Sequence, residues 1–362
     1  EPVIFQRALL REFTNTGVVV FAVLLLITIT TQLIRMLGWA AQGVIPPDGV
    51  LVLLGLAALR YLPILLALTV FLSVLMTLTR SYRDSEMIVW FTSGRGLSAW
   101  IRPVLTFAAP FIVTIAVLSL LLSPWSVRKA EVYRHQLENR DDVSAISPGV
   151  FKEAKHTERV FFVEKLTTDL SMVENVFVHS RQNERAGVMV AARGRAETAP
   201  NGDRFLVLLN GRRYEGQPGS AEFRVTEFER YALRIETKEA NRYVASRGSM
   251  PTMELLGDPT PENQAELTWR VGIPVSALIL ALLAVPMSFV NPRAGRSLNL
   301  ILAMLLYMVY SNLLSIVQSW VAQGRMPTWL GWTVVHVLMT GLFTWLLWRR
   351  MAVTPLFRWR RS

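Results

Sequence analysis

The sequence predicts a membrane α+β protein: six transmembrane helices with one antiparallel β domain, inserted outside the membrane between the third and fourth helices. Three observations predict this fold. The chain has 362 residues and is 52% apolar, which is more than ordinary soluble domains of this size carry. The apolar residues gather in six long runs. Between the third and fourth runs, short alternating segments with turn signals replace them.

Each of the six runs is long enough for a membrane-spanning helix, which needs roughly 20 mostly apolar residues. We place the spans at about 17–34, 50–78, 101–122, 271–290, 298–321 and 329–347. Three regions follow from this placement. The first three spans occupy 1–122, the β domain and its connectors occupy 123–270, and the last three spans with a basic tail occupy 271–362.

The distribution of arginine predicts the orientation in the membrane. With a cytoplasmic N-terminus, the inner short loops and both tails hold nearly all the flanking arginines, whereas the outer short loops hold only Arg35 and Arg325. Both termini are then cytoplasmic and the β domain is outside. The formal charge of +11 is explained by these flanking arginines, so we do not expect nucleic-acid binding. The chain has no cysteine, which excludes disulfides and cysteine metal sites.

The β domain is predicted from alternation and turn residues between 149 and 236. Strands are expected at about 160–163, 173–178, 188–192, 205–209 and 223–228. The Asn-Gly pairs at 201–202 and 210–211 predict tight hairpin turns, because Asn-Gly supplies positive φ angles. Short antiparallel strands in this number indicate a sandwich or a jelly roll. Alternation cannot separate a packed core from a lipid-carrying trough, and simple packing is the plainer interpretation.

No catalytic motif stands out. The sequence contains no G-x-x-x-x-G-K-[ST] loop, no H-E-x-x-H and no G-x-S-x-G, and its four histidines are scattered. We therefore expect no catalytic residues, no metal site and no cofactor. If transport is driven by ATP, a separate chain must hydrolyse it.

The segment at about 82–94 predicts a short helix between the second and third spans, on the cytoplasmic side. Met87, Trp90 and Phe91 share one face at i, i+3, i+4 spacing, and Gly94 is placed to end the helix. Asp84 and Glu86 fall in the expected first turn, where the helix dipole favours negative charge. Two interpretations stay open: an interfacial helix lying on the membrane, or a coupling helix whose aromatic face enters a groove of a motor subunit.

Three arginines, Arg35, Arg60 and Arg270, lie at or inside the outer ends of the predicted spans. Arginine within a membrane is costly and is often kept for pairing with an anion. Near a boundary, however, its long side chain can snorkel to the surface. Arg60, about ten residues into the second span, is the hardest to explain by snorkelling. Together the three predict a ring that receives phosphate groups.

The chain resembles the LptF/LptG family of lipopolysaccharide export permeases, and resembles LptF more than LptG. The likeness spans nearly the whole chain: RALLRE at 7–12, RMLG at 35–38, DSE at 84–86, AELTWR at 265–270 and VPMS at 285–288. The cytoplasmic loop motif at 291–296 adds Asn291, Pro292, Arg293 and Arg296. Each motif is weak alone, but their order around a three-plus-three helix arrangement is specific.

The resemblance implies a substrate and partners. Such permeases pair as LptF with LptG, bind a dimer of the ATPase LptB, and pass lipopolysaccharide from the Gram-negative inner membrane to LptC and the periplasmic bridge. It also implies a periplasmic β-jelly roll, contacts of Asp84 and Glu86 with the ATPase, and contacts of Arg35 and Arg270 with lipid phosphates. Gln32 departs from the family pattern, since many relatives are expected to carry lysine there.

Three alternatives stay open at this point. The chain could be the LptG-like paralogue of the same complex, which would differ in partner preference rather than in chemistry. It could be a mechanotransmission permease that does not conduct lipid, although that class commonly has four spans. A membrane-anchored hydrolase is disfavoured because no nucleophile or metal constellation is present.

Overall fold

The structure, a computed structural model, describes residues 2–42, 45–144, 151–153, 159–166, 172–182, 185–198, 204–216, 223–236, 245–289 and 296–351. The chain divides into two compact units. One, the helical unit, comprises Glu1–Tyr133 with Ala245–Ser362; the other, the β unit, comprises Arg134–Val244. Each unit is described by itself below.

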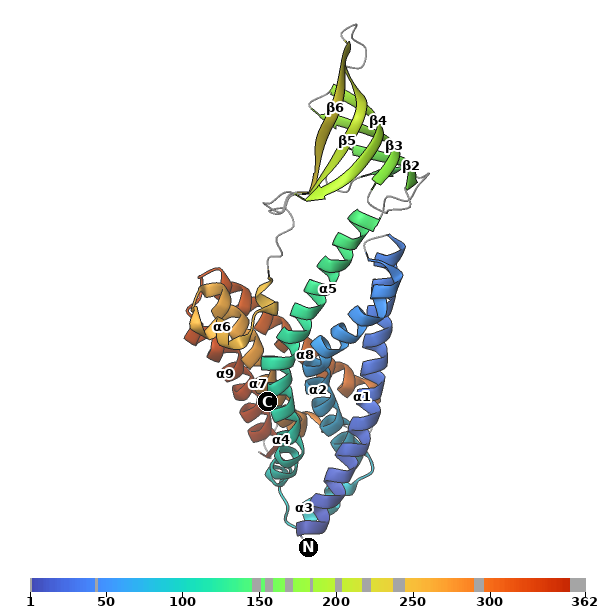
Figure 1. The fold of residues 1–362 in the computed structure, drawn as a ribbon. Helices are drawn as coiled ribbons and strands as arrows, with labels where there is room; N and C mark the ends of the chain where they lie inside the picture. The colour runs from blue at the N-terminus through green and yellow to red at the C-terminus, as the bar shows by residue number, and fades with distance from the viewer. Residues whose placement is uncertain are drawn as a thin grey trace, which may run out of the picture. The chain divides into compact units, whose positions relative to one another are not determined.

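Six helical segments among the described residues are long and apolar enough to cross a membrane, which confirms the six predicted spans. They are Gln6–Ala41, Pro47–Arg83, Leu97–Leu137, Pro261–Met287, Asn299–Ala322 and Thr328–Met351. The helices that form them are α1 (Pro2–Ala41), α2 (Val50–Arg83), α4 (Ile101–Val117), α5 (Ser123–Ser144), α7 (Pro261–Met287), α8 (Arg296–Ala322) and α9 (Thr328–Met351) (Figure 1).

Several helices extend well past the apolar run that predicted them. The 40 residues of α1 make a rod of about 60 Å, twice the thickness of about 30 Å of a bilayer's hydrocarbon core. Likewise α4 continues through a π-helical turn, η3 (Leu118–Leu122), directly into α5. The first connector of the 123–270 region is therefore helical as far as Ser144. The backbone hydrogen bonds of a helix continue where its side chains become polar. A prediction from apolar runs therefore gives helices that are shorter than the ones observed.

The second and fourth spans form the centre of the helical unit. In the apolar stretch that defines each span, 72% of the residues are buried for α2 and 67% for α7. The corresponding share is 17% for α1 and 22% for both α8 and α9. Helix α7 packs against α2, α4, α8 and α9. The apolar side chains that α1 and α8 leave exposed are therefore suited to lipid or to another subunit rather than to this chain's own core.

The β unit contains one antiparallel sheet whose strands follow one another in sequence order, β1 to β6 (Figure 1). The strands are β1 (Lys152–Glu153), β2 (Arg159–Leu166), β3 (Met172–Gln182), β4 (Arg185–Thr198), β5 (Arg204–Gly216) and β6 (Phe223–Glu236). In the chain they lie between the third and fourth spans, as the predicted antiparallel β domain requires. The described strands form a meander, and most are longer than the alternation predicted.

The Asn-Gly pair at 210–211 was predicted as a tight turn, and that prediction is wrong. Asn210 has the expected positive φ of 52°, but it lies inside β5. Asn175 in β3 has the same φ of 52°. The register is the same on both sides of this position, with Ala191↔Gly211 before it and Arg193↔Leu209 after it, so the irregularity at Asn210 is in its backbone conformation and not an inserted residue. The other Asn-Gly pair, at 201–202, lies outside the described residues.

Gly211 next to this irregularity is required by close packing. A Cβ atom there would clash with the backbone carbonyl of Val190 and would lie 2.6 Å from the Phe228 ring. The Asn-Gly signal therefore did report a positive φ and a close backbone approach. The pair alone could not predict that β4 and β6 continue on either side of β5 and hold residues 210–211 within the strand.

Candidate functional site

The predicted coupling segment is organised by Arg80, near the end of α2. Its guanidinium contacts Glu12 on α1 at 2.6 Å, Asp84 at 3.2 Å and Glu86 at 2.9 Å. The Ser81 hydroxyl also donates a hydrogen bond to Glu86 at 2.9 Å. Because the Arg80 side chain is 37% exposed, each ion pair contributes little, about 0.2–1 kcal/mol. The cluster orients the segment against α1 and α2 more than it stabilises the fold.

The segment itself is α3 (Glu86–Thr92), shorter than the helix predicted at 82–94. Ser85 adopts a left-handed conformation with φ 61°, which separates α3 from α2. Asp84 therefore caps the end of α2 rather than opening α3, and that part of the prediction is wrong. Arg83 donates a 3.0 Å hydrogen bond to Asp84 and holds the pKa of that carboxyl below its ordinary value. Gly94, with φ 85°, follows the end of α3.

The apolar face expected to meet a partner is largely turned toward the protein's own core. Met87 is 1% exposed and Trp90 is half-buried against the same core. Phe91 is 40% exposed and makes an edge contact with the Trp100 ring. The large apolar side chains that α3 presents outward are instead Ile88 and Val89, which are 61% and 66% exposed.

Of the three arginines predicted to receive phosphates, two are exposed and one is buried. Arg35 on α1 is exposed, beside the buried Gln32 and Met36. Arg60 on α2 is exposed too, with its guanidinium 5.9 Å from the ring of Tyr61. Both guanidinium groups are accessible to an anionic ligand.

Arg270 on α7 is 2% exposed, and its guanidinium is engaged on every side. Its Nε donates to Glu266 at 2.9 Å, and one terminal nitrogen donates to the Thr252 hydroxyl at 2.8 Å. The other lies 3.3 Å and 3.2 Å from the carbonyl oxygens of Arg247 and Gly248. Arg270 thus ties η4 (Arg247–Ser249) and α6 (Thr252–Gly257), the segment returning from the β unit, to α7.

The π-helical turn η3 contributes to the same anchorage. The Ser119 hydroxyl donates to the backbone carbonyl of Arg270 at 2.9 Å, and the Thr252 hydroxyl donates to the carbonyl of Leu120. A π turn breaks the regular helix ladder and leaves carbonyl groups for such partners. The contacts of Arg270 within the chain are therefore structural, and its predicted role in binding lipid phosphate stays a prediction.

The remaining predicted motif can be placed only in part. Asn291, Pro292 and Arg293 lie outside the described residues, and Arg296 is the first residue of α8. Within the described part of the chain, no three His, Asp or Glu side chains gather as a metal site would require.

Sequence reasoning missed two features of the coupling segment. The first is Arg80 as the common partner of three carboxylates. Its i, i+4 spacing to Asp84 could have indicated that pair, but the contact with Glu12, 68 residues away, could not be predicted from local spacing. The second is the exposed pair Ile88 and Val89. Helix α3 is apolar on both faces, so periodicity alone could not show which face the core would take.

Comparisons with known proteins agree with this architecture. The family model described as lipopolysaccharide export system permease LptF/LptG matches residues 7–349. The chain is 30% identical over 357 residues to the lipopolysaccharide export system permease protein LptF of Escherichia coli K12, covering 98% of this chain and 97% of the relative. LptF of Shigella flexneri matches to the same extent. A match that runs through all six spans and the β insertion shows that the chain belongs to the LptF/LptG family of lipopolysaccharide export permeases.

Proposed function

We propose that this chain is the LptF-type permease subunit of a transporter that extracts lipopolysaccharide from the inner membrane and delivers it, through the β unit, to a periplasmic bridge. The observation that carries the proposal is the match to LptF over 98% of the chain, which includes the β strands as well as the spans. Family membership and six apolar spans make it a multi-pass inner-membrane protein. The choice of LptF over LptG rests on the LptF relatives matched at 30% identity.

The proposed organisation keeps the three regions 1–122, 123–270 and 271–362, with both termini cytoplasmic and the β domain periplasmic. The arginine asymmetry of the short loops supports this orientation. The partners are an LptG-like permease, an LptB-like ATPase dimer, and LptC with the bridge proteins. Hydrolysis of ATP belongs to the LptB-like dimer in this scheme, and the permease transmits the motion.

Helix α3 is the proposed contact with the ATPase. Ile88 and Val89 form an exposed apolar surface on a helix that Arg80 fixes to α1 and α2. Movement imposed on α3 would pass through the buried Met87 into the spans. The contact is tested with Ile88→Asp, measured by recovery of the ATPase with the tagged permease. Ser98→Asp, at an exposed polar position nearby, is the matched control.

Arg35 and Arg60 are the proposed contacts for lipid phosphates, because both are exposed cations on spanning helices. The contacts of Arg270 support an anchoring role instead. Replacing Arg35 or Arg60 with Gln is expected to weaken lipopolysaccharide binding. Lys129→Gln, which removes an exposed cation on α5, controls for the general loss of charge.

The decisive experiment reconstitutes the tagged chain with its candidate partners in liposomes and measures ATP-dependent release of lipopolysaccharide to a periplasmic acceptor. Release that requires this chain and stops with an inactive ATPase supports the proposal. A stable complex that hydrolyses ATP but releases no lipid would replace it with a mechanotransmission role.

A further inference from the structure

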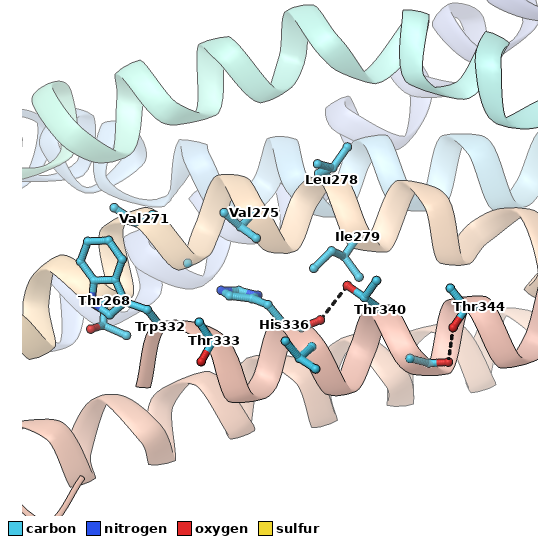
Figure 2. Close-up of a pocket in the computed structure, with 13 residues that line it drawn as sticks. Thr268, Val271, Val275, Leu278, Ile279, Trp332, Thr333, His336, Thr340 and Thr344 are labelled. Atoms are coloured by element: carbon cyan, nitrogen blue, oxygen red, sulfur yellow. Dashed lines mark hydrogen bonds between the residues drawn. The ribbon is translucent and has the colours of Figure 1, made fainter. Parts of the chain in front are cut away.

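A groove runs along the surface between α7 and α9, with a volume of about 710 Å³. Figure 2 shows the side chains that line it, with the His336 ring lying between the two helices. The α7–α9 groove is lined by Thr268, Val271, Gly272, Val275, Leu278 and Ile279 from α7, and by Trp332, Thr333, His336, Val337, Thr340, Gly341 and Thr344 from α9. The two helices start side by side, since the Thr328 hydroxyl bonds the Gln264 side chain.

The walls of the groove are apolar and carry no charged side chain. The four threonine hydroxyls in the lining donate to backbone carbonyls of their own helices: Thr268, Thr333, Thr340 and Thr344. Figure 2 shows the last two of these bonds as dashed lines. With their hydroxyls satisfied in this way, the threonines offer mainly methyl groups to an occupant.

His336 is a polar side chain of the lining and lies one turn deeper along α9 than the indole of Trp332. Its Nδ1 is 2.7 Å from the Tyr310 hydroxyl on α8, which fixes the ring. Its Nε2 points toward Gly272, 3.8 Å from where a Cβ would stand, and no described residue bonds it. When the tyrosine hydroxyl donates to Nδ1, the ring proton sits on Nε2, which can then donate to a carbonyl oxygen in the groove.

The length of the groove matches one leaflet of a membrane. From Thr268 to Ile279 and from Trp332 to Thr344 the helices rise about 16–18 Å at 1.5 Å per residue, against about 30 Å for a full hydrocarbon core. Trp332 lies one turn into α9, and tryptophan favours the membrane boundary. His336 is one turn deeper, about 6 Å along the helix, where the acyl ester of a lipid lies below its headgroup.

We propose that the α7–α9 groove binds an acyl chain of a glycerophospholipid from the leaflet nearest the starts of α7 and α9, with the ester carbonyl accepting a hydrogen bond from His336 Nε2. The uncharged lining favours this occupant over the transported lipopolysaccharide, whose phosphates call for cations. The lipid is a resident of the permease surface rather than its cargo. The proposal does not depend on the transport scheme above.

The test uses the full-length chain, alone and in its purified complex, in liposomes of phosphatidylethanolamine carrying a diazirine on one acyl chain. After photolysis, labelled peptides are located by mass spectrometry. We expect label to concentrate on the groove face of α7 and α9. Gly341→Leu should lower it severalfold, because Gly341 lines the groove, a Cβ there would meet no atom within 4 Å, and the rest of the leucine side chain would take up groove volume. Gly55→Leu, equally open but on α2, should not change it.

His336→Phe keeps a ring in the groove but removes the donor, and should lower labelling about two- to twelvefold, the equivalent of one net hydrogen bond. Label spread evenly over all exposed spans, or unchanged by Gly341→Leu, would overturn the proposal. Displacement by added lipopolysaccharide would make the site a cargo subsite instead. Loss of label only in the complete complex would show that a partner protein occupies the groove.

Discussion

Replacing Arg270 with Met removes a buried guanidinium but keeps much of its apolar length. Arg270 is 2% exposed, and the change leaves Glu266, whose side chain is only 16% exposed, without its 2.9 Å partner. It also removes the donors for the carbonyls of Arg247 and Gly248. Breaking a buried ion pair from one side costs about 3–5 kcal/mol, mostly because the remaining charge is not compensated. We expect a loss of this size in the free energy of unfolding.

The double variant with Glu266→Met separates this cause from a simple loss of packing. With both charges gone, no carboxylate is left buried, so the double variant should be less destabilised than Arg270→Met alone. Equilibrium unfolding in mixed micelles, followed by tryptophan fluorescence, measures all of these free energies. Arg35→Met, at an exposed arginine, is the matched control and should stay within about 0.5 kcal/mol of wild type.

An Arg270→Met protein as stable as Arg35→Met, or a double variant no better than the single, would refute the anchoring role. If such a stable variant also bound lipopolysaccharide weakly, Arg270 would be a phosphate ligand, as the sequence alone suggested. A destabilised variant whose return segment becomes sensitive to protease would agree with the contacts observed.

Three further predictions concern other parts of the chain. Met87→Ala should lower stability by about 2–5 kcal/mol because Met87 is 1% exposed, whereas Ile88→Ala should leave unfolding nearly unchanged and reduce only ATPase recovery in pull-down assays. Gly211→Ala should destabilise the β unit by about 1–3 kcal/mol through overpacking, seen as faster limited proteolysis there; unchanged proteolysis would contradict the packing argument. Arg83 lowers the pKa of Asp84 in the fold, so this carboxylate stabilises the protein above its unfolded pKa and loses that effect as pH falls through the folded pKa. Asp84→Asn should therefore flatten the acid side of the stability profile measured by unfolding.

The spans and the existence of an antiparallel β insertion could be predicted from the sequence because each depends on a local property. A run of about 20 apolar residues decides a span whatever it packs against. Alternation decides a half-buried strand in the same way. Gly94 was predicted to end α3 because a positive φ at that place favours glycine regardless of the rest of the fold.

Tertiary packing decided which side of each element is buried. Helix α3 is apolar on both faces, and only contact with the spans turned Met87 inward and left Ile88 outside. Arg270 carries the same charge as Arg35, but the return segment folds over Arg270 and uses its donors. Asn210 has the turn conformation its type favours, yet the paired strands on either side keep it within β5. The sequence by itself determined the elements and the family, because these follow from local pattern and motif order. The availability of each side chain to a ligand was decided by contacts between residues far apart in the chain.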